Sequence, residues 1–318
     1  RYIDARNFAD PEFPHDLSMI NTGSNDYQAA SIPSGNAQTD AAIIARAREA
    51  AKGYLYWLQT ECPRDDGAGH GYPELRPNPD AFGTPDGIAP VPYVRESRRI
   101  VALERVVAQQ LLQDGNPGPR AQLFADTCGI GTYAYMDGHA LRGVNPPMDG
   151  FWLNTYPAQI AAGTLVPRRV RNLLAACKNI GTTHLTNGLY RLHPLEWNVG
   201  EAAGALAAFS HAKGATPRDA VTQTHLLRAY QRELIGAGVP LFWWTDIAFG
   251  DPLFEAAQLA GATGVMTGDA NREMRFNPDA PVNDDERAGI EQKVGAPLPS
   301  GALNRRQAAL WLDGMGLI

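Results

Sequence analysis

The sequence predicts an α/β or α+β protein that closes with a small helical appendage. Apolar patterns recur along the chain, at residues 39–60, 170–177, 198–213 and 219–237. The run at 170–177 is short and mostly apolar, as a buried strand is, whereas the other three have helical spacing. Hydrophobic residues make up 44% of the 318 residues, which is enough to bury a sizeable core.

Composition excludes several classes of protein. The chain has 28 Lys and Arg residues against 34 Asp and Glu, so it offers no basic surface for nucleic acid. Its cysteines, Cys62, Cys128 and Cys177, form no CxxC pair, which argues against a disulfide framework and a thiolate zinc site. No apolar run reaches the roughly 18 residues of a membrane span.

The first third of the chain contains one long predicted helix between irregular segments. Residues 1–40 and 61–92 are rich in Pro and Gly and have no periodicity. Between them the helical spacing runs to Thr60, and Thr39 is the predicted N-cap. Residues 100–112 mix apolar and charged side chains, which indicates a strand leading into a helix.

The middle of the chain carries the predicted strand and the most regular helix. The GIG sequence at residues 129–131 indicates a turn. The run VRNLLAAC, residues 170–177, indicates a buried strand. Asn198 is the predicted N-cap of a helix of small residues, and Glu201, three residues later, completes a capping-box pattern.

The predicted start of that helix is a candidate ligand site. Gly200 lets a ligand approach the backbone N–H groups closely, and their partial positive charge favours an anion or a polarised oxygen. The alternative is a conventionally capped core helix without a ligand. Spacing alone does not decide between the two.

Residues 246–318 form the predicted helical appendage. Helices and turns alternate there, at residues 254–264, 264–268, 284–292 and 303–310. The sequence from Phe276 to Val282 has the pattern F-x-P-x-x-x-V. This order of helix, turn, motif and helix resembles an S-layer-homology unit, which favours an exported protein.

Two motifs resemble those of one enzyme family. Residues 92–100 read PYVRESRRI, and residues 165–209 read LVPRRVRNLLAACKNIGTTHLTNGLYRLHPLEWNVGEAAGALAAF. In this order they resemble a family of FAD-dependent oxidoreductases related to the glutathione-reductase superfamily, over roughly residues 1–245. The resemblance implies a substrate or cap region with a mixed sheet, the C-terminal part of an FAD-binding domain with a linker helix, and the appendage, at residues 1–155, 156–245 and 246–318.

The resemblance implies FAD as cofactor and assigns roles by position. Backbone amides at the predicted helix start would meet the flavin ring, at Asn198, Gly200, Glu201, Ala202 and Ala203. His184 and Arg191 would be catalytic residues near the flavin and the substrate. Substrate-site residues would come from three segments, at Asn25, Tyr27, Arg95, Glu96, Arg98 and Asp137. For Asn25 and Tyr27, a plain surface loop is the alternative.

The reaction that the resemblance implies is hydride transfer from a C–H of a small-molecule substrate to the flavin, with a base taking the accompanying proton. His184 is one candidate for the base. His139, in a D-x-H element that begins at Asp137, is the other, and a purely structural His139 is the alternative. The spacing of His139, His184 and His193 matches no common metal motif, so we expect no metal site.

The sequence also departs from the family pattern. Glu201 stands where the family usually has Gln, and Cys177 where it has Gly. No G-x-G-x-x-G turn joins a strand to a helix, although such enzymes bind the FAD pyrophosphate with one, and the chain opens at Arg1 without Met. We therefore expect the dinucleotide-binding unit on an upstream segment or a second chain. The alternative is a non-catalytic structural or cell-surface subunit that keeps the flavoprotein scaffold.

Overall fold

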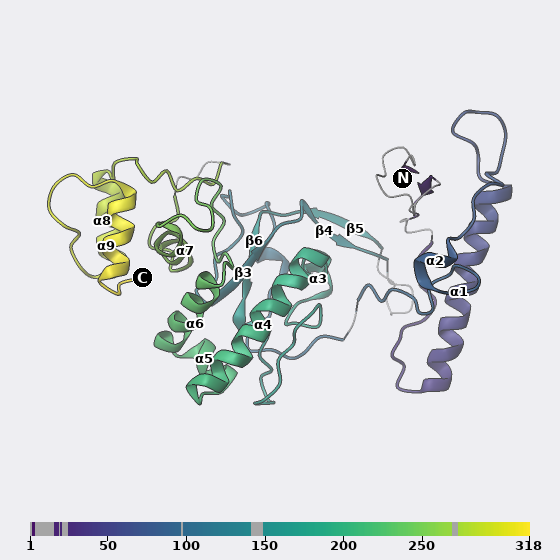
Figure 1. Cartoon of the computed structure of the whole chain (residues 1–318), viewed down its shortest axis with the longest axis horizontal. Helices are drawn as coiled ribbons and strands as arrows, with labels where there is room; N and C mark the ends of the chain where they lie inside the picture. The colour runs from purple at the N-terminus through teal and green to yellow at the C-terminus, as the bar shows by residue number, and fades with distance from the viewer. Residues whose placement is uncertain are drawn as a thin grey trace. The chain divides into compact units, whose positions relative to one another are not determined.

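A computed structural model describes residues 2–3, 16–18, 20, 25–96, 98–140, 149–268 and 273–318. The chain divides into two compact units. The first comprises Arg1–Val94 and His139–Gly150, and the second comprises Arg95–Gly138 and Phe151–Ile318. Figure 1 labels the helices and strands of both units. The three-part division of the chain, with boundaries near residues 155 and 245, stays a prediction.

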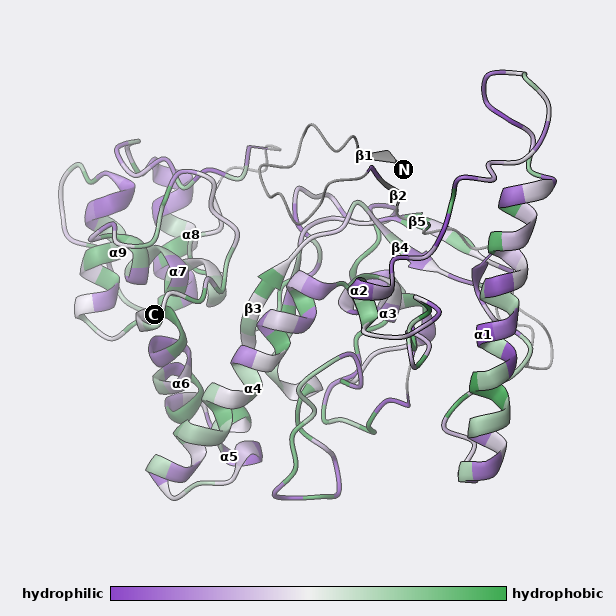
Figure 2. Ribbon diagram, turned by 45° about the vertical axis from the view of Figure 1, so that its right-hand side comes forward, coloured by the Kyte–Doolittle hydropathy of each residue, from purple (hydrophilic) through white to green (hydrophobic). Residues whose placement is uncertain are grey.

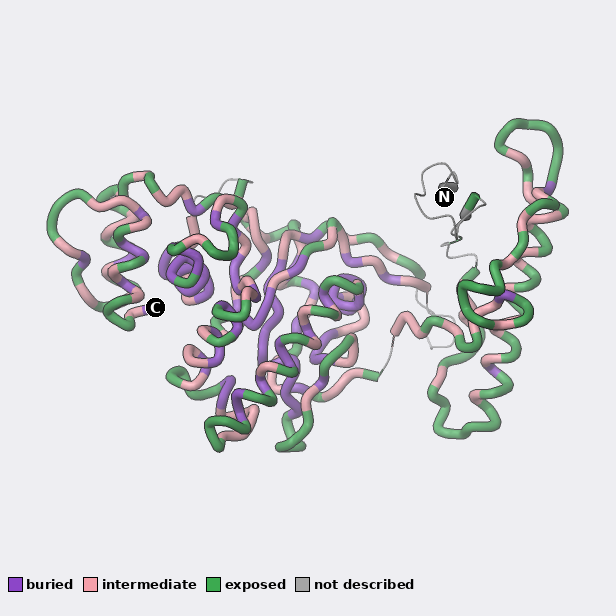
Figure 3. Tube along the Cα trace, viewed as in Figure 1, coloured by how far each residue is buried: buried purple, intermediate pink, exposed green. Residues whose placement is uncertain are grey.

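The first unit is built around one long, exposed helix. Most of α1 (Ala37–Thr60) is exposed, and its buried residue is Ile43 (Figure 3). Asn36 caps the helix, because its side-chain oxygen accepts hydrogen bonds from the N–H groups of Gln38 and Thr39. The prediction of Thr39 as N-cap is therefore wrong, since Thr39 already lies in the first turn. The unit also contains the short elements β1 (Tyr2–Ile3), β2 (Leu17–Ser18) and α2 (Pro79–Phe82).

The second unit combines helices with small antiparallel sheets. β3 (Thr127–Gly131) pairs antiparallel with β6 (Ala158–Ala161), and β4 (Tyr135–Gly138) pairs antiparallel with β5 (Phe151–Asn154). The helices follow in chain order, α3 (His184–Tyr190), α4 (His193–Lys213), α5 (Pro217–Thr222), α6 (Thr224–Gly236), α7 (Phe254–Ala262), α8 (Asp284–Val294) and α9 (Arg305–Gly314). This mixture confirms the predicted α/β or α+β class.

Residues 129–131 belong to strand β3, so the predicted turn is wrong. Helix α4 packs against this strand (Figure 1), and residues of α4 lie directly over both glycines. A Cβ on Gly129 would lie 1.7 Å from Asn198 Oδ1, and one on Gly131 would lie 2.4 Å from Leu195 Cγ. The two glycines therefore allow the close approach of strand and helix rather than a change of chain direction.

Residues 170–177 form no strand, so this prediction is also wrong for the described chain. Ala175 is buried, whereas Val170 and Leu173 are 47% and 49% exposed. Among the described residues the run has no neighbouring strand with which it forms a ladder. An apolar pattern alone cannot supply that neighbour.

Residues 100–112 contain a 3-10 helix, η3 (Ala108–Gln110), instead of the predicted strand and helix. Isolated bridges hold the segment, such as the parallel bridge between Val106 and Thr182. A single bridge fixes one residue pair, and no ladder extends from it. A second 3-10 helix, η4 (Ala162–Thr164), follows β6.

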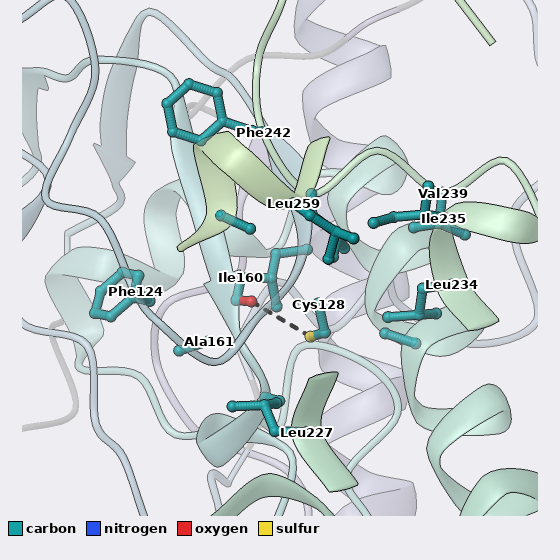
Figure 4. Close-up of a cluster of buried hydrophobic side chains, with 14 of the residues drawn as sticks. Phe124, Cys128, Ile160, Ala161, Leu227, Leu234, Ile235, Val239, Phe242 and Leu259 are labelled. Carbon is teal, nitrogen blue, oxygen red and sulfur yellow. Dashed lines mark hydrogen bonds between the residues drawn. The ribbon is translucent and has the colours of Figure 1, made fainter. Parts of the chain in front are cut away.

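The core of the second unit lies where β3 and β6 meet the helices. Figure 4 shows the part around Cys128, whose thiol donates a hydrogen bond to the Ile160 carbonyl oxygen at 3.3 Å. Burial raises the pKa of this thiol well above its usual range, so Cys128 acts as a small apolar side chain. Helix α6 has both hydrophobic and hydrophilic residues along its length (Figure 2), and it buries residues such as Leu227 and Leu234.

The C-terminal segment is helical, as predicted, and two polar contacts order it. The Asp246 carboxylate accepts hydrogen bonds from the N–H groups of Phe276 and Asn277, both at 2.8 Å. The buried Arg305 pairs with Glu286 at 2.9 Å. The first contact fixes the loop between α7 and α8, and the second joins α8 to α9.

Helix α3 lies directly on strand β4, and Gly188 permits this contact. A Cβ at Gly188 would lie 2.6 Å from the backbone oxygen of Asp137 and 2.8 Å from its backbone nitrogen. Because these are backbone atoms, a side chain there would push the helix away from the strand. Gly204, in α4, has nothing within 4 Å of the same position.

We expect one substitution to have opposite effects at these two helical glycines. Gly204→Ala should raise the free energy of unfolding by about 1 kcal/mol, because alanine loses less backbone entropy in a helix. Gly188→Ala should lower it by about 1–3 kcal/mol, because the new methyl group overpacks against Asp137. Urea unfolding of the two variants measures both values. Equal gains at both positions would contradict the close contact between α3 and β4.

Candidate active site

Helix α3 carries polar side chains along one face. The helix begins at His184 because Thr183 Oγ1 accepts from the Thr186 N–H at 3.2 Å, and Thr186 Oγ1 accepts from the Thr183 N–H at 2.8 Å. His184, Asn187 and Arg191 follow at spacings of three and four residues, so they share one face. Arg191 forms the C-cap of the helix. This polar face is the candidate active site.

His184 is held by a carboxylate at one nitrogen and unbonded at the other. Its Nδ1 lies 2.7 Å from Glu96 Oε1, and a carboxylate only accepts, so Nδ1 carries the proton. Arg99 pairs with the same carboxylate at 3.3 Å, and the edge of Phe151 meets the imidazole ring at 5.6 Å between centroids. His184 Nε2 is buried and has no partner among the described residues. The histidine is therefore oriented with a basic nitrogen left over.

Arg191 is 4% exposed and pairs with Asp137. Its Nη2 donates to the backbone oxygen of Asp137 at 2.9 Å and to its carboxylate at 3.2 Å. Arg191 Nε is buried and lacks a partner within the described part of the chain. The hydroxyl groups of Tyr133 and Tyr135 lie 3.3 Å apart, and this hydrogen bond raises the pKa of Tyr133 to about 12. Tyr133 therefore stays neutral at physiological pH.

Asn187, between these two residues, was not predicted from the sequence. Its side chain is fully buried, and neither the amide nitrogen nor the oxygen has a partner in the described ranges. Other buried carboxamides are bonded. Gln231 donates to the carbonyl oxygens of Ala125 and Thr127 at 3.1 and 2.9 Å. The signal that could have found Asn187 is its spacing from His184 and Arg191.

The structure brings predicted residues that are distant in sequence together as two pairs. Glu96 lies beside His184, and Asp137 beside Arg191. Arg95 and Arg98 flank Glu96 in the chain, the first half-buried and the second exposed. In the described residues, no group of three or more His, Cys, Asp or Glu side chains is arranged to hold a metal ion. No described helix combines the length and apolarity that crossing a membrane requires.

His139, the second candidate base, belongs to the first unit. Its Nδ1 lies 2.9 Å from Asp26 Oδ2. Asn25, on one side of Asp26, is exposed, and Tyr27, on the other side, is half-buried. These three predicted residues are thus near one another within the first unit.

The helix start predicted at Asn198 is wrong. Helix α4 begins at His193, with Leu192 as N-cap and Pro194 in the first turn. Proline is preorganised for the first turn of a helix, so the helix starts at the turn that contains Pro194. Asn198 does not act as an N-cap, because its side chain packs against Gly129. The residues predicted to offer free amides lie inside the helix instead, at Asn198, Gly200, Glu201, Ala202 and Ala203. Their N–H groups are directed to carbonyl oxygens four residues earlier.

A family model described as FAD dependent oxidoreductase matches residues 1–234 of the chain. No curated protein and no solved structure matches it significantly. The matched range includes α3, the first turn of α4 and the Glu96 segment. It therefore contains all of the candidate active site, whereas the C-terminal helices lie outside it.

Asn187 makes a testable difference to stability. Asn187→Leu, which keeps the shape of the side chain, should raise the free energy of unfolding by about 1 kcal/mol, because it removes two buried unbonded polar atoms. Gln231→Met is the matched control and should lower it by about 1–3 kcal/mol, because two carbonyl oxygens lose their donor. Thermal and urea unfolding measure both. A loss at Asn187 as large as that at Gln231 would show that its amide is bonded in the folded chain.

Proposed function

The chain belongs to the FAD-dependent oxidoreductase family, whose cofactor is FAD, and we propose that it is the part or subunit that prepares an organic substrate for hydride transfer to the flavin. The observation that supports this most strongly is the pair formed by His184 and Glu96. Both residues lie in the motifs by which the sequence resembles the family. Their distance of 2.7 Å joins the two motifs in space.

His184 acts in this proposal as the general base. Its Nε2 takes the proton from a substrate O–H or N–H while the adjoining C–H bond loses its hydride. Glu96 accepts the hydrogen bond from Nδ1, which fixes the tautomer and stabilises the imidazolium that forms. Glu96 is thus a positioning residue, since it acts through His184. Bound FAD supplies the hydride acceptor.

The first turn of α4 fits the polar edge of a flavin ring. The N-cap residue, Leu192, has no side-chain oxygen with which to cap this turn. The partial positive charge of a helix start favours an oxygen-bearing edge. Arg191 directly precedes the turn, and its buried Nε lacks a described partner. We assign the flavin contact to this turn rather than to the stretch from Gly200 to Ala203.

The remaining predicted residues are assigned to the substrate. Arg191 and Asp137 form an ion pair at the end of α3, and Arg95 and Arg98 flank Glu96 in the chain. Asn25 and Tyr27 stay proposed substrate residues, and His139, paired with Asp26, is the alternative base. The two candidate bases are separable by mutation.

The dinucleotide-binding unit is proposed to reside on an upstream segment or a second chain. The 318 residues contain no G-x-G-x-x-G turn between a strand and a helix. Residues 246–318 are proposed to be an S-layer-homology-like unit of an exported protein. The hydrogen bond from the Phe276 N–H to the Asp246 carboxylate and the ion pair between Glu286 and Arg305 support a compact helical module there.

The first test is the absorption spectrum of the protein from its native source, together with the intact mass of every chain present. We expect the two visible bands of an oxidised flavin and a segment or chain that carries a G-x-G-x-x-G turn. A colourless preparation that holds the present chain alone would contradict the enzyme and leave a structural subunit.

The second test uses the bleaching of that flavin by organic donors under anaerobic conditions. His184→Ala should slow reduction by about 10²–10⁴-fold while the flavin stays bound. Glu96→Gln should give a smaller loss, because glutamine can still accept the hydrogen bond from Nδ1 but brings no negative charge to the imidazolium. The control, His211→Ala, changes an exposed histidine of α4 and should have no effect. Full activity of His184→Ala with loss in His139→Ala would transfer the role of base to His139.

A further inference from the structure

The second unit contains a pocket that the candidate active site does not use. Its volume is about 410 Å³, which is within the range of small-molecule sites. Strand β3, the loop between α6 and α7, and helix α7 line it. Apart from Ile130, its lining residues lie beyond residue 234, where the match to the family model ends. The pocket is therefore a feature of this chain's C-terminal part.

Aromatic rings line this pocket. Phe242, Trp243, Trp244 and Phe249 come from the loop, and Phe254 comes from α7. The rings of Phe249 and Phe254 meet edge to face, with 5.5 Å between their centroids. Phe249 is nevertheless 66% exposed. A ring that is supported by a neighbour and open to solvent is available to pack against the ring of a ligand.

Gln258, in the wall of the pocket, is buried and uses one end of its carboxamide. It is 1% exposed, and its Oε1 accepts from the N–H groups of Leu241, at 2.8 Å, and Phe242, at 2.7 Å. Its Nε2 has no partner among the described residues. The buried Gln159 uses both ends, because it accepts from the Phe124 N–H and donates to the Leu241 carbonyl oxygen. The free N–H groups of Gln258 therefore call for an acceptor from a ligand.

The charges around the pocket favour a neutral ligand. Aromatic pockets often bind quaternary ammonium ions. Here, however, the guanidinium of Arg120 already lies 4.4 Å from the ring centre of Phe242 and 4.9 Å from that of Trp244. A second cation would be repelled by it. An anion would meet no charged side chain among the described lining residues, so its lost hydration would go uncompensated there.

The polar groups of the wall disfavour a sugar. A pyranose stacks on aromatic rings, but each of its hydroxyl groups both donates and accepts hydrogen bonds. In the wall, Gln258 Oε1 is occupied by two N–H groups, and the Thr245 hydroxyl donates to the Glu273 carbonyl oxygen. The polar group left for a ligand at Gln258 is a donor. It matches a ring compound whose oxygen only accepts.

We propose that this pocket binds a neutral aromatic carbonyl compound, taken up from solution. The ring of the ligand packs against Phe249 and its aromatic neighbours, and the carbonyl oxygen accepts a hydrogen bond from Gln258 Nε2. The inference goes beyond the proposed function and does not rest on it, because His184, Glu96 and the first turn of α4 take no part in the pocket.

Calorimetric titration of the chain of residues 1–318 tests the ligand class. Acetophenone should bind at a single saturable site. Ethylbenzene has the same shape with a methylene group in place of the carbonyl, so it should bind about tenfold more weakly, since it cannot accept a hydrogen bond. Methyl glucoside and tetramethylammonium should show no binding.

Several results of this titration would overturn the proposal. They are no saturable binding of acetophenone, equal affinity for ethylbenzene, and tighter binding of the glucoside or of the ammonium ion. The last two would assign the pocket to a sugar or to a cation instead.

Two variants place the binding in this pocket. Gln258→Glu keeps an acceptor for the N–H groups of Leu241 and Phe242 but removes the donor, so it should weaken acetophenone binding by about tenfold or more. Phe249→Ala should weaken the binding of both ring compounds by roughly three- to tenfold. Its melting temperature should stay unchanged, because Phe249 is largely exposed.

Phe82→Ala, at a phenylalanine of α2 that is 55% exposed, is the matched control and should leave every affinity unchanged. Phe249→Ala decides alone if Gln258→Glu lowers the melting temperature. Unchanged acetophenone binding in Phe249→Ala, or an equal loss in Phe82→Ala, would contradict the proposal.

Discussion

The close contact between α3 and β4 is the constraint on which the candidate active site depends. Gly188 has no side chain, so the helix rests on the backbone of Asp137. That approach lets Arg191 reach both the carbonyl and the carboxylate of Asp137, and it sets His184 against Phe151. Without it, the polar face of α3 would separate from the carboxylates that orient it.

The polar side chains of this face form only some of the hydrogen bonds that they could form. In both His184 and Arg191, one side-chain nitrogen contacts a carboxylate and another has no described partner. In Asn187, neither the amide nitrogen nor the amide oxygen has a described partner. Unbonded buried polar groups cost stability, by about 1–3 kcal/mol each. The bonded amide of Gln231 in the same unit shows that this fold satisfies buried carboxamides elsewhere. Four such atoms lie on this face, and further buried polar atoms without a described partner lie elsewhere, at Asn179, Asn198 and Ser210.

Sequence reasoning predicted the structure correctly where it depends on a local pattern. It failed where the structure depends on packing against a segment that is distant in sequence. The helical stretches and the fold class follow from periodicity, and the two motifs named both Glu96 and His184. The GIG sequence at residues 129–131 suggests a turn, yet its glycines serve the packing of α4, which no local pattern records. Asn198 has every feature of an N-cap but lies inside a helix that starts at His193. The strand predicted at residues 170–177 would need a neighbouring strand, and periodicity does not reveal whether one is present.

Arg120 shows how the segments around α7 are joined to the rest of the second unit without a carboxylate. It donates to the carbonyl oxygens of Trp243 and Thr267, and its guanidinium lies 4.4 Å from the ring centre of Phe242. Burial lowers the pKa of Arg120 to about 10, so it remains charged at neutral pH. Carbonyl dipoles and aromatic faces balance that charge. Because those partners precede and follow α7, one guanidinium group holds the segments on both sides of that helix.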